Sequence, residues 1–154
     1  MNLEKLGDST IGKLILKILG AVMESRFRYR FFGPAKILTG ADLQSGQTIL
    51  EVGCGTGFFT LPAAQIIGEH GCLVAMDILP ESIEFVSKKV QAAHLQNVRA
   101  VKGDIRNTGF DAECFHKVLL FGVIPAPMLP LTQILTEIHR ILKPEVICRS
   151  VLSC

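Results

Sequence analysis

The sequence lacks any apolar run long enough to cross a membrane. Its most apolar N-terminal stretch, residues 11–23, is interrupted by Lys13 and Lys17 and is shorter than the ~20 residues that a spanning helix needs. The stretch also differs from a signal peptide, because Glu4 and Asp8 occupy the place of a basic n-region and no cleavage site follows. We therefore expect a cytoplasmic protein.

The cysteine patterns of metal-bound and disulfide-linked proteins are also missing. None of the five cysteines forms a C-x-x-C pair, and no histidine stands at zinc-finger spacing from one. An odd number of cysteines without a secretion signal is typical of free thiols in a reducing compartment. We predict neither a disulfide framework nor a metal site.

The chain has little net charge, +2 at neutral pH, but the charge is unevenly placed. Residues 1–40 carry seven lysines and arginines against three acids, and the remainder carries nine against eleven. This N-terminal basic excess is a mild indication of an anionic partner or surface. With 49% hydrophobic and 19% charged residues, the chain can build the core of one compact domain.

Strand and helix patterns alternate from about residue 47 onward. Strands are predicted over residues 48–52, 72–77, 98–102, 117–121 and 146–152, and helices over 58–67, 81–94 and 131–142. Glu84 and Lys88 form an i,i+4 pair on the second of these helices, and Pro144 terminates the last one. Alternation at these lengths predicts an α/β fold, a doubly wound parallel sheet in a three-layer α/β/α arrangement.

The first 44 residues follow a different pattern. Apolar residues fall on one face of a predicted amphipathic helix over residues 11–23, and Gly33, Pro34 and Gly40 punctuate the passage into the α/β part. We therefore divide the chain into an N-terminal helical, lid-like segment, residues 1–44, and an α/β domain, residues 45–154.

A cluster of glycines stands between the first predicted strand and the helix that follows it. The segment is Glu51-Val-Gly53-Cys-Gly55-Thr-Gly57. Glycines there allow a sharp turn and a close approach of a ligand to the backbone, and the N–H groups at the helix start favour a charged small molecule. A dinucleotide loop, G-x-G-x-x-G, would place its third glycine where Phe58 stands, and the lysine of a phosphate-binding P-loop is absent.

The segment EVGCGTGFFT resembles motif I, E-x-G-x-G-x-G, of class I methyltransferases that use S-adenosylmethionine. The resemblance covers roughly residues 45–145 and is strongest to the ubiquinone- and menaquinone-biosynthesis type. It implies a Rossmann-like fold, S-adenosylmethionine as cofactor and S-adenosylhomocysteine as product.

The resemblance also implies a set of cofactor-binding residues. Asp77, at the end of the second strand, would accept hydrogen bonds from the ribose hydroxyls, and Ile78 would lie against the adenine face. Asp104 matches the acid that meets the adenine amino group, and Ile105 matches its neighbour on the ring. The full predicted set is Glu51, Gly53, Cys54, Gly55, Thr56, Gly57, Asp77, Ile78, Asp104, Ile105 and Phe121.

Two features depart from the family pattern. The family has seven strands, whereas about five are predicted here, and Glu145-Val146 stands where a Gly-Gly turn follows Leu142-Lys-Pro144 in the family. We expect either a natural short form or a reading frame cut or altered near residue 145, and in both cases a chain that is truncated after strand five and lacks the last two strands of the family. Strand five would then be an open sheet edge, which predicts a homodimer or a poorly soluble monomer.

No residue is assigned a catalytic role. Methyl transfer from a sulfonium needs alignment of donor and acceptor, and a general base only if the acceptor must lose a proton. His116 and His139 are candidates by chemistry, although surface or packing histidines are the commoner interpretation.

The segments flanking the domain bear on the acceptor. Residues 121–127, FGVIPAP, lack an Asn-Pro-Pro-Tyr pattern and are apolar, which fits either a hydrophobic acceptor or a rigid connector. Residues 26–32 mix arginines with aromatics, so they form a lid in which Tyr29 or an arginine reaches the methionine carboxylate, or an amphipathic segment docked on the domain. A membrane surface could bind residues 11–32, and a nucleic-acid partner is disfavoured.

Three functions remain open. The leading hypothesis is methylation of a small, apolar acceptor such as a quinone or a lipid. The second is a catalytically degenerate S-adenosylmethionine-binding protein left by truncation. The third, a nicotinamide-dependent oxidoreductase, is disfavoured by Phe58 at the place of the final glycine.

Overall fold

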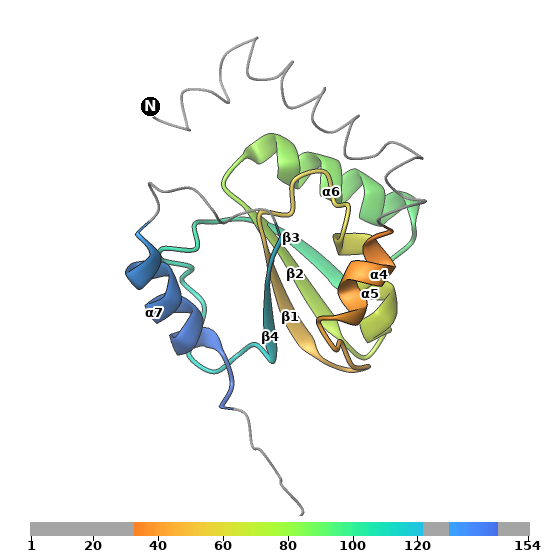
Figure 1. Cartoon of the computed structure of the whole chain (residues 1–154). Helices are drawn as coiled ribbons and strands as arrows, with labels where there is room; N and C mark the ends of the chain where they lie inside the picture. The colour runs from red at the N-terminus through yellow and green to blue at the C-terminus, as the bar shows by residue number, and fades with distance from the viewer. Residues whose placement is uncertain (1–32, 122–129, 145–154) are drawn as a thin grey trace, which may run out of the picture.

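The computed structural model describes residues 33–121 and 130–144 (Figure 1). The predicted helix over residues 11–23, most of the segment 121–127 and the predicted strand over residues 146–152 lie outside the described residues.

Four parallel strands form the sheet of the described part of the chain. They are β1 (Thr48–Val52), β2 (Cys72–Asp77), β3 (Val98–Lys102) and β4 (Lys117–Leu120), in the order β3-β2-β1-β4. The bounds of the first three are those predicted, and β4 ends one residue earlier. The two central strands, β1 and β2, are almost wholly buried because each is apolar along nearly its whole length, as expected for strands covered on both faces.

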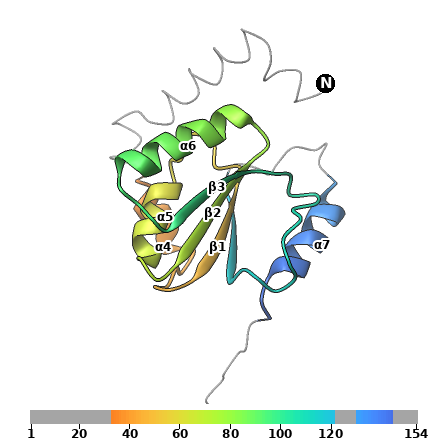
Figure 2. The same ribbon diagram turned by 180° about the vertical axis from the view of Figure 1, so that it is seen from behind.

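Helices cover both faces of this sheet, as Figures 1 and 2 show. On one face lie α4 (Pro34–Thr39), α5 (Thr60–Ile67) and α6 (Pro80–Ala92), and on the other lies α7 (Leu131–Ile141). Each face has its own apolar core: Ile49 and Leu73 pack with the first group, and Leu50 and Val74 pack with α7. The predicted three-layer α/β/α fold with a doubly wound parallel sheet is confirmed.

One helix was not predicted, and another begins later in the sequence than predicted. The passage around Gly33-Pro34 contains α4, in which Pro34 takes a first-turn position and Leu38 packs into the core. Helix α5 begins at Thr60 instead of residue 58, because Phe58 and Phe59 lie in the preceding turn with their rings edge to face. Both rings are buried, so the turn is part of the core.

The remaining helix ends fall close to the predicted ones. Helix α6 begins at Pro80 and ends at Ala92, and the predicted Glu84–Lys88 ion pair is present at 2.6 Å. Helix α7 ends at Ile141, before Pro144, because Leu142 turns extended and forms a parallel bridge with Phe115 just ahead of β4. None of the helices in the described ranges has both the length and the apolar character needed to cross a bilayer.

Candidate functional site

The glycine loop, residues 53–57, leaves the carboxyl end of β1 and turns into α5. Gly53, Gly55 and Gly57 have φ values of 72°, 52° and 79°, a region that other residues enter only at a cost. The loop is fastened to the neighbouring strand, since the N–H groups of Gly53 and Cys54 donate to the carbonyl of Met76 at 2.8 and 3.1 Å. The backbone path of this loop therefore favours glycine at all three positions.

Asp77 ties the end of β2 to this loop. One carboxylate oxygen accepts the N–H of Gly55 at 2.9 Å and the other accepts the N–H of Leu79 at 3.0 Å. The residue is 9% exposed, so these two backbone donors fix its orientation. Each oxygen keeps a further lone pair that can accept a hydrogen bond from a ligand hydroxyl.

Glu51 lies beneath the loop, 2% exposed, and its Oε2 accepts a hydrogen bond from the Thr60 hydroxyl at 2.6 Å. Burial raises the pKa of Glu51 to about 7, the Thr60 hydrogen bond opposes that rise, and the charge of Asp77 adds to it. Glu51 was predicted from the motif as a cofactor contact, and its partner in the structure is the first residue of α5. The spacing of nine residues gave no sequence signal for this pairing.

The side chains of Cys54 and Thr56 differ in their surroundings. Burial raises the pKa of the Cys54 thiol, which makes it a packing group and not a nucleophile. The Thr56 hydroxyl is buried and has no hydrogen-bond partner among the described residues. A buried hydroxyl without a partner is costly, so a ligand that supplies one is favoured at this point of the loop.

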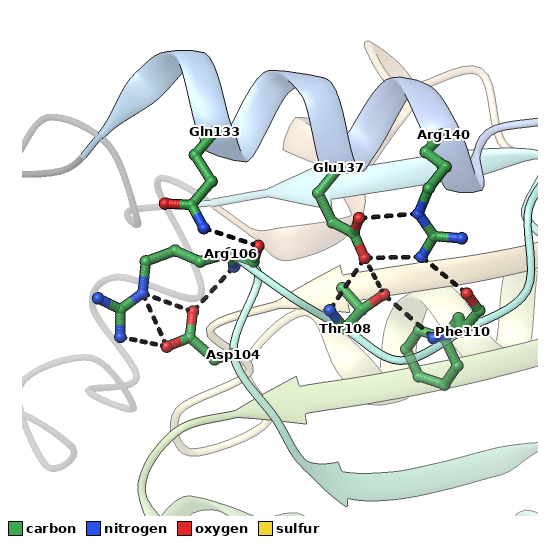
Figure 3. Close-up of polar contacts among 7 residues, drawn as sticks. All are labelled: Asp104, Arg106, Thr108, Phe110, Gln133, Glu137 and Arg140. Atoms are coloured by element: carbon green, nitrogen blue, oxygen red, sulfur yellow. Dashed lines mark hydrogen bonds and ion pairs between the residues drawn. The ribbon is translucent and has the colours of Figure 1, made fainter.

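Asp104 follows β3 and is held by its neighbour Arg106, as Figure 3 shows. The Arg106 backbone N–H donates to Oδ1 at 2.8 Å, and its guanidinium forms a close ion pair with the same carboxylate. These contacts lower the pKa of Asp104, the side-chain hydrogen bond from Arg106 most of all. Ile105, between them, is buried against the core of the α7 face.

Helix α7 holds the loop that follows Asp104 (Figure 3). The N–H and the hydroxyl of Thr108 donate to Glu137 at 2.9 and 2.7 Å, and Arg140 bridges Glu137 to the carbonyl of Phe110. Chiefly because of the Arg140 hydrogen bond, the pKa of Glu137 falls to about 2. This clamp was not predicted; the Glu137–Arg140 spacing of three on a helix was its only signal in the sequence.

The other predicted contact residues lie around the same edge of the sheet. Ile78 is 41% exposed directly after Asp77, and the Phe121 ring, at the end of β4, packs 4.3 Å from the Phe59 ring. The carboxyl ends of parallel strands meet at one edge, so the residues after β1, β2, β3 and β4 gather there.

The two histidines considered for catalysis lie elsewhere. His116 precedes β4, and its Nδ1 accepts the N–H of Thr48 at 2.8 Å, at the end of the sheet opposite to the glycine loop. His139 is exposed on α7. Within the described ranges, no three His, Cys, Asp or Glu side chains are grouped so that they could hold a metal ion.

The fold and this edge define a class: a Rossmann-like domain with a glycine loop after β1 and an acid after β2. The comparisons with known proteins then give the family. A family model described as "Methyltransferase domain" matches residues 49–145, and the chain belongs to that family. Its assignment to the class I, S-adenosylmethionine-dependent type is confirmed, and demethylmenaquinone methyltransferases are among the proteins it resembles.

Several relatives are similar over the same region. A demethylmenaquinone methyltransferase of Shouchella clausii is 32% identical over 110 residues, which are 70% of this chain and 46% of the relative. Aklanonic acid methyltransferase DauC of a Streptomyces species is 31% identical over 96 residues, 61% and 44% of the two chains. The chain thus spans about half the length of these relatives.

Solved structures agree. A SAM-dependent methyltransferase from Aquifex aeolicus superposes with a TM-score of 0.70 at 26% identity, covering 85% of this chain and 67% of that one. A structure from Methanococcus maripaludis, at 20% identity and a TM-score of 0.70, covers 85% and 59% and shows the shared fold.

Proposed function

We propose that this chain binds S-adenosylmethionine at the edge formed by the glycine loop, Asp77 and Asp104, and transfers its methyl group to a small, apolar, quinone- or lipid-like acceptor. The observation that carries the proposal is the hydrogen bond from Gly55 to Asp77, which joins motif I to the acid of the next strand. S-adenosylhomocysteine is the product.

The residues of this edge fit the cofactor by their chemistry. The loop glycines have no side chain to block a ligand beside the backbone, and the Thr56 hydroxyl, which has no hydrogen-bond partner among the described residues, favours a polar group there. Asp77 has lone pairs for a vicinal diol, exposed Ile78 offers an apolar surface to a flat ring, and Asp104 can accept from an amino group. Glu51, Cys54, Ile105 and Phe121 would support these contacts from behind or beside them.

When bound, S-adenosylmethionine supplies a methyl carbon activated by its positively charged sulfur. The task left to this chain is to hold donor and acceptor in line and to keep water out, which is a matter of positioning. His116 lies at the end of the sheet opposite to the glycine loop and His139 is exposed on α7, so neither is assigned as a general base.

The identity of the acceptor is supported by the names of two relatives. One is a demethylmenaquinone methyltransferase and the other an aklanonic acid methyltransferase, both names of small-molecule enzymes. The family match to a methyltransferase domain sets aside the nicotinamide-dependent alternative. A cofactor-binding protein without turnover is the second candidate, and the methyl-transfer assay described below separates it from the enzyme.

Some expectations remain predictions because they depend on residues outside the described ranges. These are the membrane contact through residues 11–32, the lid over residues 26–32, and the homodimer formed through the edge of the predicted strand over residues 146–152. The division of the chain at residue 44, the cytoplasmic location and the absence of a nucleic-acid partner are also kept as predictions.

The test begins with calorimetric titration of the protein with S-adenosylmethionine and S-adenosylhomocysteine. Micromolar binding of both is expected. Transfer of a labelled methyl group to members of a quinone and lipid panel is then followed, with Asp77→Ala as the control for a contaminating enzyme. No binding by a folded protein would contradict the proposal, and binding without transfer to any acceptor would favour the second candidate.

A further inference from the structure

Two adjacent lysines of α6 have different partners. Lys88 forms an exposed ion pair with Glu84 on the same helix. Lys89 points toward the glycine loop, and its ammonium donates to the carbonyl oxygen of Thr56 at 2.8 Å, across 33 residues of sequence. The Lys89 contact is partly buried, and it joins α6 to the loop that we propose binds the cofactor.

The Thr56–Gly57 peptide is held from both sides. Its carbonyl accepts from Lys89, and its N–H, which belongs to Gly57, donates to the carbonyl of Cys54 at 2.8 Å. Gly57 has a φ of 79°, and a glycine permits rotation of the preceding peptide at little steric cost. Lys89 therefore opposes the rotation that Gly57 would otherwise allow.

Packing places the same helix against the same peptide. A Cβ built on Gly57 would lie 3.2 Å from Cγ2 of Val86, one turn before Lys89 on α6. The loop thus rests on α6 by an apolar contact and by one hydrogen bond with a charged donor. A hydrogen bond with a charged donor is about twice as strong as one between neutral groups.

We propose that Lys89 is a positioning residue, which fixes the Thr56–Gly57 peptide and keeps the glycine loop in its binding conformation before the cofactor arrives. Its effect on cofactor affinity depends on the proposed function, whereas its effect on the loop does not. Without the ammonium, the loop must be ordered during binding, and that ordering reduces affinity.

The test uses three variants: Lys89→Met, Lys89→Arg and, as the matched control, Lys88→Met. Amide hydrogen exchange of Gly57 is measured in the ligand-free protein, and affinity for S-adenosylhomocysteine by calorimetry. For Lys89→Met we expect about tenfold faster exchange and about tenfold weaker binding, the size of one hydrogen bond with a charged donor. Lys89→Arg should restore most of the slow Gly57 exchange and most of the affinity. Lys88→Met should have the exchange rate and the affinity of the unaltered protein.

Wild-type exchange and affinity in Lys89→Met would overturn the proposal, as would equal losses in Lys88→Met, which would indicate a general charge effect. If Lys89→Met does not fold, Lys89→Gln, whose amide is too short to reach the same carbonyl, takes its place. If the unaltered protein does not bind S-adenosylhomocysteine, the proposed function fails, and the exchange of Gly57 still decides the role of Lys89.

Discussion

The carboxyl ends of β2 and β3 each present an aspartate to the same edge of the sheet, but the two are held in different ways. Asp77, after β2, is 9% exposed and is fixed by the backbone N–H groups of Gly55 and Leu79. Asp104, after β3, has a side chain that is 36% exposed and is held largely by the side chain of Arg106. Asp77 is held by two backbone donors, whereas Asp104 is held by one backbone donor and by the half-exposed side chain of Arg106.

The carboxyl groups near the two aspartates also differ. Near Asp77 lies buried Glu51, whose pKa is raised, and the loop after Asp104 is held through Thr108 by Glu137, whose pKa is lowered by Arg140. Rigid backbone donors preorganise a site, whereas exposed ion pairs contribute little energy and adjust to a ligand. We infer that the β2 end sets the affinity for the cofactor and that the β3 end adjusts to it.

The largest expected effect separates the two aspartates directly. Asp77→Ala should weaken binding of S-adenosylhomocysteine by about 100-fold, because two backbone donors lose their acceptor together with the ligand hydroxyls. Asp104→Ala should weaken it by only about fivefold, since its carboxylate is partly exposed and already paired. Calorimetry on both variants is the measurement, and an equal or larger loss for Asp104→Ala would reverse the comparison.

The pH dependence of stability should have opposite signs at the two ends, and the part between pH 4.5 and 7 comes from Glu51. Its pKa is about 7 in the folded chain, against an ordinary value of 4.5, so the folded state binds more protons between these values. The free energy of unfolding should therefore fall as pH rises from about 4.5 to 7, by up to about 3 kcal/mol. Glu51→Gln should abolish this fall, as urea unfolding at a series of pH values would show.

Glu137 provides the opposite case in the same experiment. Its pKa is lowered to about 2, so its contribution to stability is present above about pH 4.5 and is lost as pH falls toward 2. Glu137→Gln should remove that acid-side loss and leave the dependence between pH 4.5 and 7 unchanged. If both variants changed the same pH range, the assignment of the two carboxyls would be wrong.

A smaller effect tests whether the glycine loop needs Gly57 for its φ value alone or also for its contact with α6. Gly57 and Gly46 have nearly the same φ, 79° and 81°, but only at Gly57 would a Cβ meet another side chain, that of Val86. Gly46→Ala should cost about 1 kcal/mol of unfolding free energy for its backbone alone, and Gly57→Ala about 2 kcal/mol. If urea unfolding gave equal losses of unfolding free energy for the two variants, the Val86 side chain of α6 would be shown to shift and accommodate the added methyl group.

The smallest effect is expected at Arg106. Because its ion pair with Asp104 is largely exposed, Arg106→Gln should change the unfolding free energy by less than about 0.5 kcal/mol. The pKa of Asp104 should rise toward its ordinary value, which carboxyl NMR titration can follow. A large loss of unfolding free energy would show that the Arg106–Asp104 ion pair stabilises the fold, and it would contradict the proposed difference between Asp104 and Asp77.

Much of the fold could be predicted from the sequence because its signals are local. The strands β1 and β2 are apolar runs closed by a glycine or an aspartate, and such runs have few alternative conformations. Helix α4 was missed because it is only six residues long, flanked by Gly33 and Gly40, and depends on packing of Leu38. Short helices are stabilised by tertiary contacts that a sequence pattern does not contain.

The site shows the same limit. The order of Gly53, Gly55, Gly57 and Asp77 along the chain predicted which elements meet at the edge of the sheet. The contacts that stabilise them were not predicted, because Glu51 bonds Thr60 nine residues away and Lys89 bonds Thr56 across 33. Such pairings depend on how α5 and α6 pack on the sheet, which the spacing of residues does not determine.

The most direct test of the central claim is amide NMR of the protein during titration with S-adenosylhomocysteine. We predict shifts concentrated at residues 53–57, at Asp77 and Ile78, and at Asp104 and Ile105, with no shift at Thr48 and His116 on the opposite end of the sheet. Shifts centred on Thr48 and His116, or no shifts in a folded protein, would contradict a cofactor site at this edge.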